Sequence, residues 1–475
     1  MILNSLMKFA ACICGLHRGG KSGRHSSHSN VYSSETISMI KVLKFGGTSV
    51  GSAQNMKRVA EIVRREQATV TVLSAMSGTT DALVQISKLA ADGDLAAIGK
   101  VLDMLRDKYS TCIDGLLTAT RQKAFDRMEA AWTTILAAAT DFQPYTSERT
   151  IIAQGELLTS AIFTQYLVES GSDAVCLNAP DFMITDADTK VNAKLLHERL
   201  SALTADKKKF YVTQGFICTN YRGEIDNLGR GGSDYSAALM GAAIDAGQVQ
   251  IWTDIDGMHN NDPRFVDHTY PIRTMSFCEA AELAYFGAKI LHPSTIQPCQ
   301  DHGIPVLLKN TMDPDAPGTT ISDADESTQS FHAVAAKDGI TVIRIYSARM
   351  LMAYGFLRKV FEVFEQYRTP IDMITTSEVA VSLTIDNDAH IDRIVEELAP
   401  LGKIEIERDN SIVCVVGRIE HTDTGLAARV FDGLKQVPIK MISYGASHHS
   451  ITMLINTQDK KQTLQYLNDY LFNQQ

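Results

Sequence analysis

The sequence predicts an α/β protein whose first part is an open, mostly parallel sheet sandwiched by helices and whose second part is a small α+β unit that occurs twice. From residue 40 onward, short apolar runs end in glycine-rich turns, and helical periods follow these turns. The second part is predicted by the order strand, helix, strand, strand, helix, strand, which then recurs. Residues 311–330, rich in Pro, Asp, Gly and Ser, mark the boundary between the two parts.

The composition favours a soluble enzyme that acts on small molecules. The chain has 475 residues, of which 45% are apolar and 21% charged, enough for two or three domains. Its net charge of -10 argues against a nucleic acid or an anionic membrane as partner. No apolar run approaches the roughly 20 residues of a membrane-spanning helix. The eight cysteines lack framework spacing, so we expect free thiols and a cytoplasmic location.

Residues 1–38 differ from the rest, because they are Ser-rich and contain a single acidic residue, Glu35. We expect this segment to be disordered, and three interpretations stay open: an upstream start before Met39, an organellar transit peptide, or a tail of no assigned role. Its GLHRGGKS stretch (15–22) matches the phosphate-loop pattern, but no helical period follows it. A working phosphate loop leaves a strand and opens a helix, so we do not expect this motif to bind phosphate.

The elements of the first domain, residues 39–325, follow from periodicity. Strands are expected at 40–44, 68–74, 208–220, 249–258 and 304–310. Helices are expected at 52–66 with Ser52 as N-cap, at 82–90, at several places within 93–142, at 151–170 with Glu156 near its start, in the later part of 227–247, and at 279–296 as far as the break before Pro293.

Lys44 ends the first strand and precedes Gly46 and Gly47. Open α/β sheets bind ligands beyond the carboxyl ends of their strands, and the two glycines let backbone N–H groups approach an anion. By itself KFGG is equally an ordinary surface turn.

The stretch GRGGSDYSAA is a stronger anion-binding signal. Arg230 offers bidentate hydrogen bonds, Gly231 and Gly232 suit an anion nest, and Ser233 is expected to cap the helix that follows. Asp234 either complements the helix dipole as a first-turn acid or orients a lysine in a kinase-like site.

Further polar residues follow a later strand. Thr253, Asp254 and Asp256 close the run IWTDIDG, where carboxylates suit a ribose hydroxyl or phosphate-bound magnesium, although DxDG is also a common turn. Arg264 and Lys289 add two cations in the same domain.

Taken together, KFGGTSVG, LSAMSGTTD, AQGELLTS, TQGF, LGRGGSDYSAA, WTDIDG, NDPR and FGAKILHP closely resemble the aspartate kinases of the amino acid kinase family, in order and roughly in spacing. The resemblance runs from Met39 to the end of the chain, because the doubled unit at 331–475 is similar to the tandem ACT domains of these enzymes. It implies an amino acid kinase-like catalytic domain followed by ferredoxin-like ACT domains.

The resemblance implies transfer of the γ-phosphoryl group of ATP to the side-chain carboxylate of L-aspartate, the entry to lysine, threonine and methionine synthesis. Magnesium is expected to enter with ATP and to be held by phosphates and water, so no protein metal site is assigned. Residues matching catalytic positions are Lys44, Asp234 and Arg230. Residues matching aspartate-binding positions are Thr80, Glu156, Arg230, Gly231, Gly232 and Ser233. Residues matching ATP-binding positions are Lys44, Gly46, Gly47, Thr253, Asp254, His259, Arg264, Lys289 and Ile290.

Two positions depart from the family pattern. The family often has tyrosine where this chain has His259, which puts that nucleotide contact in doubt. The Thr-rich run usual before LGRGG is IDN (225–227) in this chain. Neither change removes a charge that the expected chemistry needs.

In the second part, residues 350–379 look most like the lysine-sensitive members of the family, so lysine is expected as feedback inhibitor ahead of threonine. Because the chain stops after the second ACT unit, a monofunctional enzyme is expected, assembled as a homodimer or homotetramer through ACT sheets. Residues matching effector positions are Met350, Phe356, Leu357, Asp372, Thr376, Ser377 and Glu378.

Two other functions stay open from the sequence. One is a different amino acid kinase on the same fold, and the other is a non-catalytic amino-acid sensor that uses only its ACT units. The complete lysine, arginine and aspartate set argues against the sensor.

Overall fold

The computed structural model describes residues 39–229, 231–287, 291, 295–323, 329–350, 354–420 and 422–472. The leader with GLHRGGKS, together with Arg230, Lys289 and Ile290, lies outside the described residues. No helix in the described ranges is long and apolar enough to cross a membrane. The six cysteines that the structure describes are free thiols.

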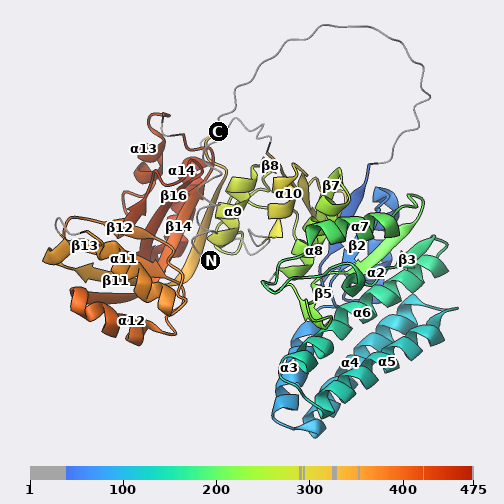
Figure 1. The fold of residues 1–475 in the computed structure, drawn as a ribbon. Helices are drawn as coiled ribbons and strands as arrows, with labels where there is room; N and C mark the ends of the chain where they lie inside the picture. The colour runs from blue at the N-terminus through green and yellow to red at the C-terminus, as the bar shows by residue number, and fades with distance from the viewer. Residues whose placement is uncertain are drawn as a thin grey trace, which may run out of the picture. The chain divides into compact units, whose positions relative to one another are not determined.

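The first part of the chain forms an eight-stranded sheet in the order β3-β4-β2-β1-β7-β9-β10-β8 (Figure 1). Among these strands, β9 and β10 pair antiparallel and every other neighbouring pair is parallel. The predicted open, mostly parallel sheet is therefore confirmed. Its strands are β1 (Lys41–Phe45), β2 (Val70–Leu73), β3 (Ala174–Cys176), β4 (Phe210–Gln214), β7 (Gln248–Thr253), β8 (Thr274–Met275), β9 (Val306–Asn310) and β10 (Thr319–Ile321).

β1 is central and lies between β2 and β7. The chain leaves β1 toward β2 and β4 and then returns to β7 on the other side of β1. This reversal makes a topological switch point, the place where open α/β sheets leave a crevice at the carboxyl ends of their strands. Lys44 and the glycines after it stand at this point.

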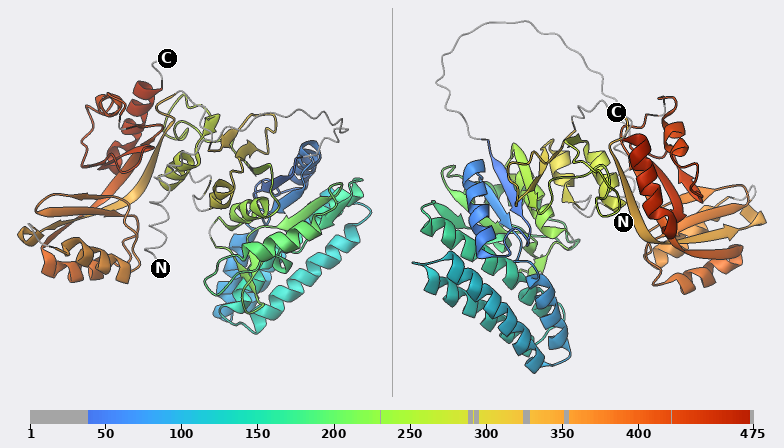
Figure 2. Two further views of the ribbon diagram at one scale, coloured as in Figure 1. Left: turned by 45° about the horizontal axis from the view of Figure 1, so that its top comes forward. Right: turned by 180° about the vertical axis from the view of Figure 1, so that it is seen from behind.

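Helices cover both faces of the sheet, because neighbouring residues of a strand point to opposite sides. Leu43 belongs to the core on one face and Val42 to the core on the other. α4 (Leu95–Leu116) and α5 (Arg121–Thr140) lie side by side (Figure 2), which confirms the helices predicted within 93–142, but they form an outer layer that packs on the helices of the first face and not on the sheet itself. The first face carries α2 (Ala53–Glu66), α3 (Thr79–Ala91) and α6 (Thr146–Glu169). The second carries α7 (Ala193–Leu203), α8 (Gly232–Ala243) and α10 (Gln297–Asp301).

Local differences from the sequence prediction have identifiable causes. Ser52 caps α2 as expected, since its side chain accepts the N–H of Asn55 at 3.2 Å. The single strand predicted at 208–220 is wrong, because Phe216 has φ +68° and ends the ladder after β4. The chain continues as a hairpin of β5 (Ile217–Thr219) and β6 (Ile225–Asn227). The helix expected at 279–296 is shorter, because α9 spans Phe277–Tyr285.

The second part forms a six-stranded antiparallel sheet in the order β12-β13-β11-β14-β16-β15. The doubled unit is present, but its halves share strands. β11 begins at Ala333, and its residues 333–337 pair with 412–416 of β14. Gly339, with φ +77°, allows the register shift between the two halves of β11, so KDG bulges instead of turning. The strands are β11 (Ala333–Tyr346), β12 (Ile374–Thr376), β13 (Ala380–Ile385), β14 (Lys403–Val416), β15 (Met441–Ser443) and β16 (Ser450–Asn456).

One face of this sheet is covered by its own helices, and the other shares an apolar core with α9 of the first part. Ile343 faces the helices, whereas Val342 belongs to the core that contains Leu283 of α9. The fold therefore joins the end of the first part to the regulatory-type sheet directly. The helices are α11 (Phe356–Gln366), α12 (Ile391–Leu398), α13 (Leu426–Asp432) and α14 (Lys460–Leu471).

Candidate active site

The Lys44 ammonium and the Asp234 carboxylate meet at the switch point of the sheet. Lys44 Nζ lies 2.6 Å from Asp234 Oδ1, and the two side chains are 12% and 14% exposed. β1 supplies the lysine, and the first turn of α8 supplies the acid. Because both groups are mostly shielded from water, each fixes the orientation of the other. Of the two roles open to Asp234, the geometry favours that of orienting the lysine.

The glycine loop after β1 packs tightly against the loop after β2. A Cβ on Gly47 would stand 2.8 Å from the carbonyl oxygen of Ala75, so only glycine fits this approach. The N–H of Gly46 donates to the carbonyl of Trp252 at 3.2 Å, which ties the loop to the end of β7. KFGG is therefore more than a surface turn, since it is held between two strand ends beside Lys44.

The loop after β2 contacts both elements expected to bind the amino acid. The Ser74 hydroxyl donates to Ser233 Oγ at 3.0 Å, and the N–H of Ala75 donates to Glu156 Oε1 at 3.3 Å. A Cβ on Gly215 would overlap Ser233, at 2.6 Å from its Cβ. Sequence reasoning missed Ser74, for which the only signal was a small polar residue at a strand end.

Ser233 does not cap α8, contrary to the sequence prediction. Gly231 occupies the N-cap position with φ +72° and no side-chain cap, and Gly232 begins the helix. Gly231 takes the left-handed conformation at no steric cost, which leaves the Ser233 hydroxyl free to bind Ser74 instead. The N–H groups in the first turn of α8 still point out of its N-terminus, the end of a helix that attracts anions.

Glu156 is a buried carboxyl in the middle of α6, which begins ten residues earlier at Thr146 and not at the predicted 151. Its side chain is 3% exposed. Burial raises the pKa of Glu156 to about 7, opposed by hydrogen bonds from backbone groups including Ala75. Within the described residues, Oε2 has no hydrogen-bond partner. A buried carboxylate oxygen of this kind suits an ammonium group brought by a ligand.

The residues expected to bind nucleotide are only partly brought together. Thr253 ends β7, and its hydroxyl donates to the exposed Asp254 at 3.0 Å. His259 Nε2 lies 2.7 Å from Asp256 Oδ1 and its Nδ1 lies 3.2 Å from Thr269. His259 therefore already has two polar neighbours from its own loop.

Arg264 lies in a segment that packs against α14. Its side chain is 76% exposed and forms an ion pair with Asp262 at 2.6 Å. The neighbouring Asn261 donates to the carbonyl of Leu464 at 3.1 Å.

Thr80 is half-buried in the first turn of α3, and no group of three metal-ligating side chains occurs in the described ranges. Asp234 is engaged by Lys44, and no residue of this chain is assigned to a metal ion.

The residues expected to bind an effector are not gathered in one place, because Asp372 lies beside Thr384, whereas Thr376 pairs with Val381 at the opposite end of β12 and β13. Phe356 is buried in the core beneath α11, where Met350 packs against it, while Leu357 is 37% exposed. The Asp372 side chain is 0% exposed and forms an ion pair with Lys337 at 2.9 Å. Thr376, Ser377 and Glu378 are exposed at the end of β12.

Asp372 also accepts a hydrogen bond from the Tyr285 hydroxyl at 2.6 Å, so it contacts the last residue of α9. Burial, followed by the hydrogen bond to Asp372, raises the pKa of Tyr285 and keeps its hydroxyl protonated as a donor. Lys337 lies over the Tyr285 ring at 4.4 Å. No local pattern in the sequence points to Lys337 or Tyr285, because their contacts join segments far apart in the chain.

Comparison with known proteins identifies the family. The model of the amino acid kinase family matches residues 39–310, and an ACT domain model matches residues 413–471. The lysine-sensitive aspartokinase 3 of Escherichia coli is 33% identical over 452 residues, which cover 92% of this chain and all of that protein.

Solved structures agree with the sequence matches. E. coli aspartokinase III in complex with aspartate and ADP, described as the R-state, aligns with a TM-score of 0.79 at 33% identity, covering 91% of this chain and all of that one. The same enzyme with lysine and aspartate, described as the T-state, aligns with a TM-score of 0.76 over 91% of this chain and 99% of that one. This chain belongs to the amino acid kinase family and, within it, to the aspartokinases.

Proposed function

We propose that this protein transfers the γ-phosphoryl group of ATP to the side-chain carboxylate of L-aspartate and so forms 4-phospho-L-aspartate, the first step toward lysine, threonine and methionine. The observation that carries the proposal is the Lys44–Asp234 pair at the switch point of the sheet. It occurs in a chain that matches the full length of an aspartokinase whose structure holds aspartate and ADP.

In this proposal, the chain positions charges and supplies no covalent nucleophile. The substrate carboxylate is already ionised at pH 7, so no general base is needed to activate it. Lys44 neutralises the charge that develops on the transferring phosphoryl group, and Asp234 holds its ammonium in place. Gly46 and Gly47 belong to the loop beside Lys44, and the Gly46 N–H is already bonded to the Trp252 carbonyl, so it anchors this loop to β7.

The amino acid is held between α6 and the start of α8. Glu156 offers a buried carboxylate oxygen to the α-ammonium of aspartate, and Ser233 stands across the loop that follows β2. The residues that we assign to aspartate are Thr80, Glu156, Arg230, Gly231, Gly232 and Ser233.

The nucleotide lies beyond the ends of β1 and β7, and magnesium accompanies its phosphates, with phosphate and water oxygens as its main ligands. The residues that we assign to ATP are Lys44, Gly46, Gly47, Thr253, Asp254, His259, Arg264, Lys289 and Ile290. In this assignment residues 39–325 carry catalysis and residues 331–475 carry regulation.

The test is a hydroxamate assay on the purified full chain with ATP and magnesium. Hydroxylamine traps acyl phosphates, so we expect hydroxamate to form with L-aspartate and not with L-glutamate or N-acetylglutamate. Absence of an aspartate-dependent product would refute the proposal, whereas product with another acid alone would identify a different amino acid kinase.

We propose that lysine regulates the enzyme by binding at Asp372, and the contacts of this residue support the proposal. In the structure its carboxylate is held by the Lys337 ammonium and the Tyr285 hydroxyl. An effector ammonium that competes for this carboxylate would weaken its contact with α9, and α9 leads directly to Lys289 in the sequence. The effector residues are those expected from the sequence: Met350, Phe356, Leu357, Asp372, Thr376, Ser377 and Glu378.

Replacing Asp372 by asparagine is expected to raise the lysine concentration for half-inhibition by about tenfold or more, because the amide keeps the shape and loses the charge. Glu407→Gln is a matched control, since Glu407 pairs with Lys440 in the second unit at a site that mirrors Asp372 and Lys337. Inhibition curves of both variants with lysine check this result. Equal curves for Asp372→Asn and the wild type would remove Asp372 from the effector site.

Self-assembly through the regulatory sheet is proposed from its exposed apolar side chains. Ile374 of β12, Val379 and Ile442 of β15 are 38%, 48% and 43% exposed, and β12 and β15 are the end strands of the sheet order. A homodimer or homotetramer is therefore expected in sedimentation equilibrium. A monomer at micromolar concentration would contradict this expectation.

A further inference from the structure

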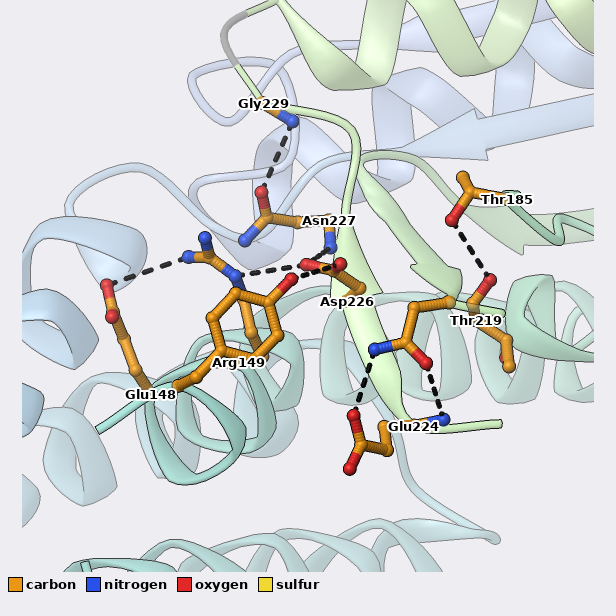
Figure 3. A network of polar contacts seen from close by, with 10 residues as sticks. Glu148, Arg149, Thr185, Thr219, Glu224, Asp226, Asn227 and Gly229 are labelled. Atoms are coloured by element: carbon orange, nitrogen blue, oxygen red, sulfur yellow. Dashed lines mark hydrogen bonds and ion pairs between the residues drawn. The ribbon is translucent and has the colours of Figure 1, made fainter. Parts of the chain in front are cut away.

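A buried carboxylate in the middle of β6, the second strand of the β5–β6 hairpin, is held by one residue of α6 and by the N-cap residue of this helix. The Asp226 side chain is 7% exposed, and its Oδ1 accepts Arg149 Nε at 3.0 Å. Its Oδ2 accepts a hydrogen bond from the Tyr145 hydroxyl at 2.5 Å. Figure 3 shows Arg149 reaching from α6 to Asp226, with Glu148 on the opposite side of its guanidinium. Arg149 is 25% exposed, so this pair is better shielded than a surface ion pair.

Arg149 stands on the part of α6 that faces the site. It precedes Glu156 by seven residues, which is close to two helical turns, so both side chains leave the same face of α6. The two residues are separated by roughly 10 Å along the helix axis. A shift of α6 at Arg149 would therefore be transmitted to Glu156 by a rigid helix.

Asp226 stands on the segment that leads to α8. The Asn227 side chain accepts the N–H of Gly229 at 3.2 Å, as Figure 3 shows, and the N–H of Leu228 donates to Phe216 at 2.8 Å. The N–H of Gly232, the first residue of α8, donates to the carbonyl of Gly229 at 3.1 Å. This series of hydrogen bonds links β6 to the first residue of α8, so a displacement of β6 would also displace the start of α8.

The two elements also meet on their other side. The loop after β2 contacts Ser233 through Ser74 and Glu156 through Ala75. Two connections therefore join α6 to the start of α8, and together they form a closed frame. The first runs through the loop after β2, and the second runs through the Arg149–Asp226 pair and β6. The amino-acid-binding groups lie on opposite sides of this frame.

We propose that Arg149 and Asp226 are positioning residues for the amino acid substrate, because their ion pair fixes the distance between Glu156 on α6 and the N-terminus of α8. This inference rests on the proposed function. It goes beyond the residues assigned to aspartate, because neither Arg149 nor Asp226 is among them. Neither residue touches the substrate; both act through the elements that do.

The test compares steady-state kinetics of the full chain in four variants. Arg149→Leu and Asp226→Asn break the pair, Arg149→Lys keeps the charge, and Arg106→Leu is the matched control. Arg106 pairs with Glu129 at 3.0 Å and so joins α4 to α5, away from β6 and α8. We expect Arg149→Leu and Asp226→Asn to raise KM for aspartate by about tenfold and to leave KM for ATP within about twofold. Arg149→Lys should recover part of the loss, and Arg106→Leu should change neither constant.

Hydrogen exchange of residues 225–236 adds a readout that does not depend on turnover. Faster exchange of this segment in Arg149→Leu, and not in Arg106→Leu, supports the frame. An unchanged KM for aspartate in both pair-breaking variants, with only a lower Tm, would show a purely structural role and overturn the inference. A parallel rise in KM for ATP would overturn it too, because the frame would then have no preference for the amino acid. A wild-type protein that phosphorylates no aspartate would refute the proposed function, and the positioning role with it.

Discussion

Replacing Lys44 by alanine is expected to lower kcat by about 10²–10³-fold while the protein still folds. The ammonium is the cation that Asp234 holds at the carboxyl end of β1, 2.6 Å from its carboxylate. Removing it leaves the developing phosphoryl charge without this partner, whereas KM for aspartate should change little, because Glu156 and the start of α8 are untouched. Steady-state kinetics with varied ATP and aspartate measure both constants.

Lys41→Ala provides the control for this result. Lys41 lies at the other end of the same strand and pairs with Glu66 at 3.1 Å. Its loss should leave kcat near that of the wild type. Lys44→Arg keeps the charge on a bulkier head group and should retain folding, which a thermal melt verifies. Near-normal kcat in Lys44→Ala would exclude Lys44 from the mechanism.

Replacing Glu156 by glutamine is expected to raise KM for aspartate by roughly 10- to 100-fold, because a buried carboxylate that would meet an ammonium becomes neutral. The pH dependence gives a second signature. With a pKa of about 7, Glu156 is mostly protonated at pH 6 and mostly ionised at pH 8. We therefore expect kcat/KM for aspartate in the wild type to rise about tenfold over this window, and to be nearly flat in the variant.

The same group makes stability depend on pH in a defined direction. The pKa of Glu156 is raised on folding from 4.5 to about 7, so the native state binds the proton more tightly. The free energy of unfolding should fall by up to about 3 kcal/mol as the pH rises from the lower to the higher of these two pKa values. Above the higher value it should stay at the lower level. Glu156→Gln should lack this fall, which denaturant unfolding at pH 5 and pH 8 detects.

Glu169→Gln is the control on the same helix. Glu169 ends α6 and accepts hydrogen bonds from Thr118 and Thr120, which lower its pKa. This substitution should leave KM for aspartate unchanged. A wild-type kcat/KM for aspartate that is flat between pH 6 and pH 8 would contradict the assignment of Glu156 to the substrate ammonium.

Much of the fold was readable from local patterns. The short apolar runs predicted the central strands, and KFGG and GRGGSD at strand ends indicated candidate anion-binding loops. These signals are local, because a strand end and the loop after it are neighbours in the chain. A local pattern does not show the bulge at KDG in β11, which forms because residues 333–337 pair with 412–416 far along the chain.

The sequence also suggested Glu156 and Asp234 as site residues, but left their state open. The pKa of Glu156 arises from burial beneath the loop after β2, and the role of Asp234 arises from the approach of Lys44 across two elements. Neither effect has a local signature. The Arg149–Asp226 pair was missed for the same reason, since its members are 77 residues apart.

By itself the sequence determined the class of fold, the candidate anion-binding loops and the family, because each depends on short stretches whose backbone chemistry is set by neighbouring residues. Only the tertiary structure decided which charges meet, which carboxyl is buried and how the regulatory unit contacts α9. Those properties depend on distances between segments that the chain brings together only when it folds, and electrostatic energies change steeply with distance and with exclusion of water.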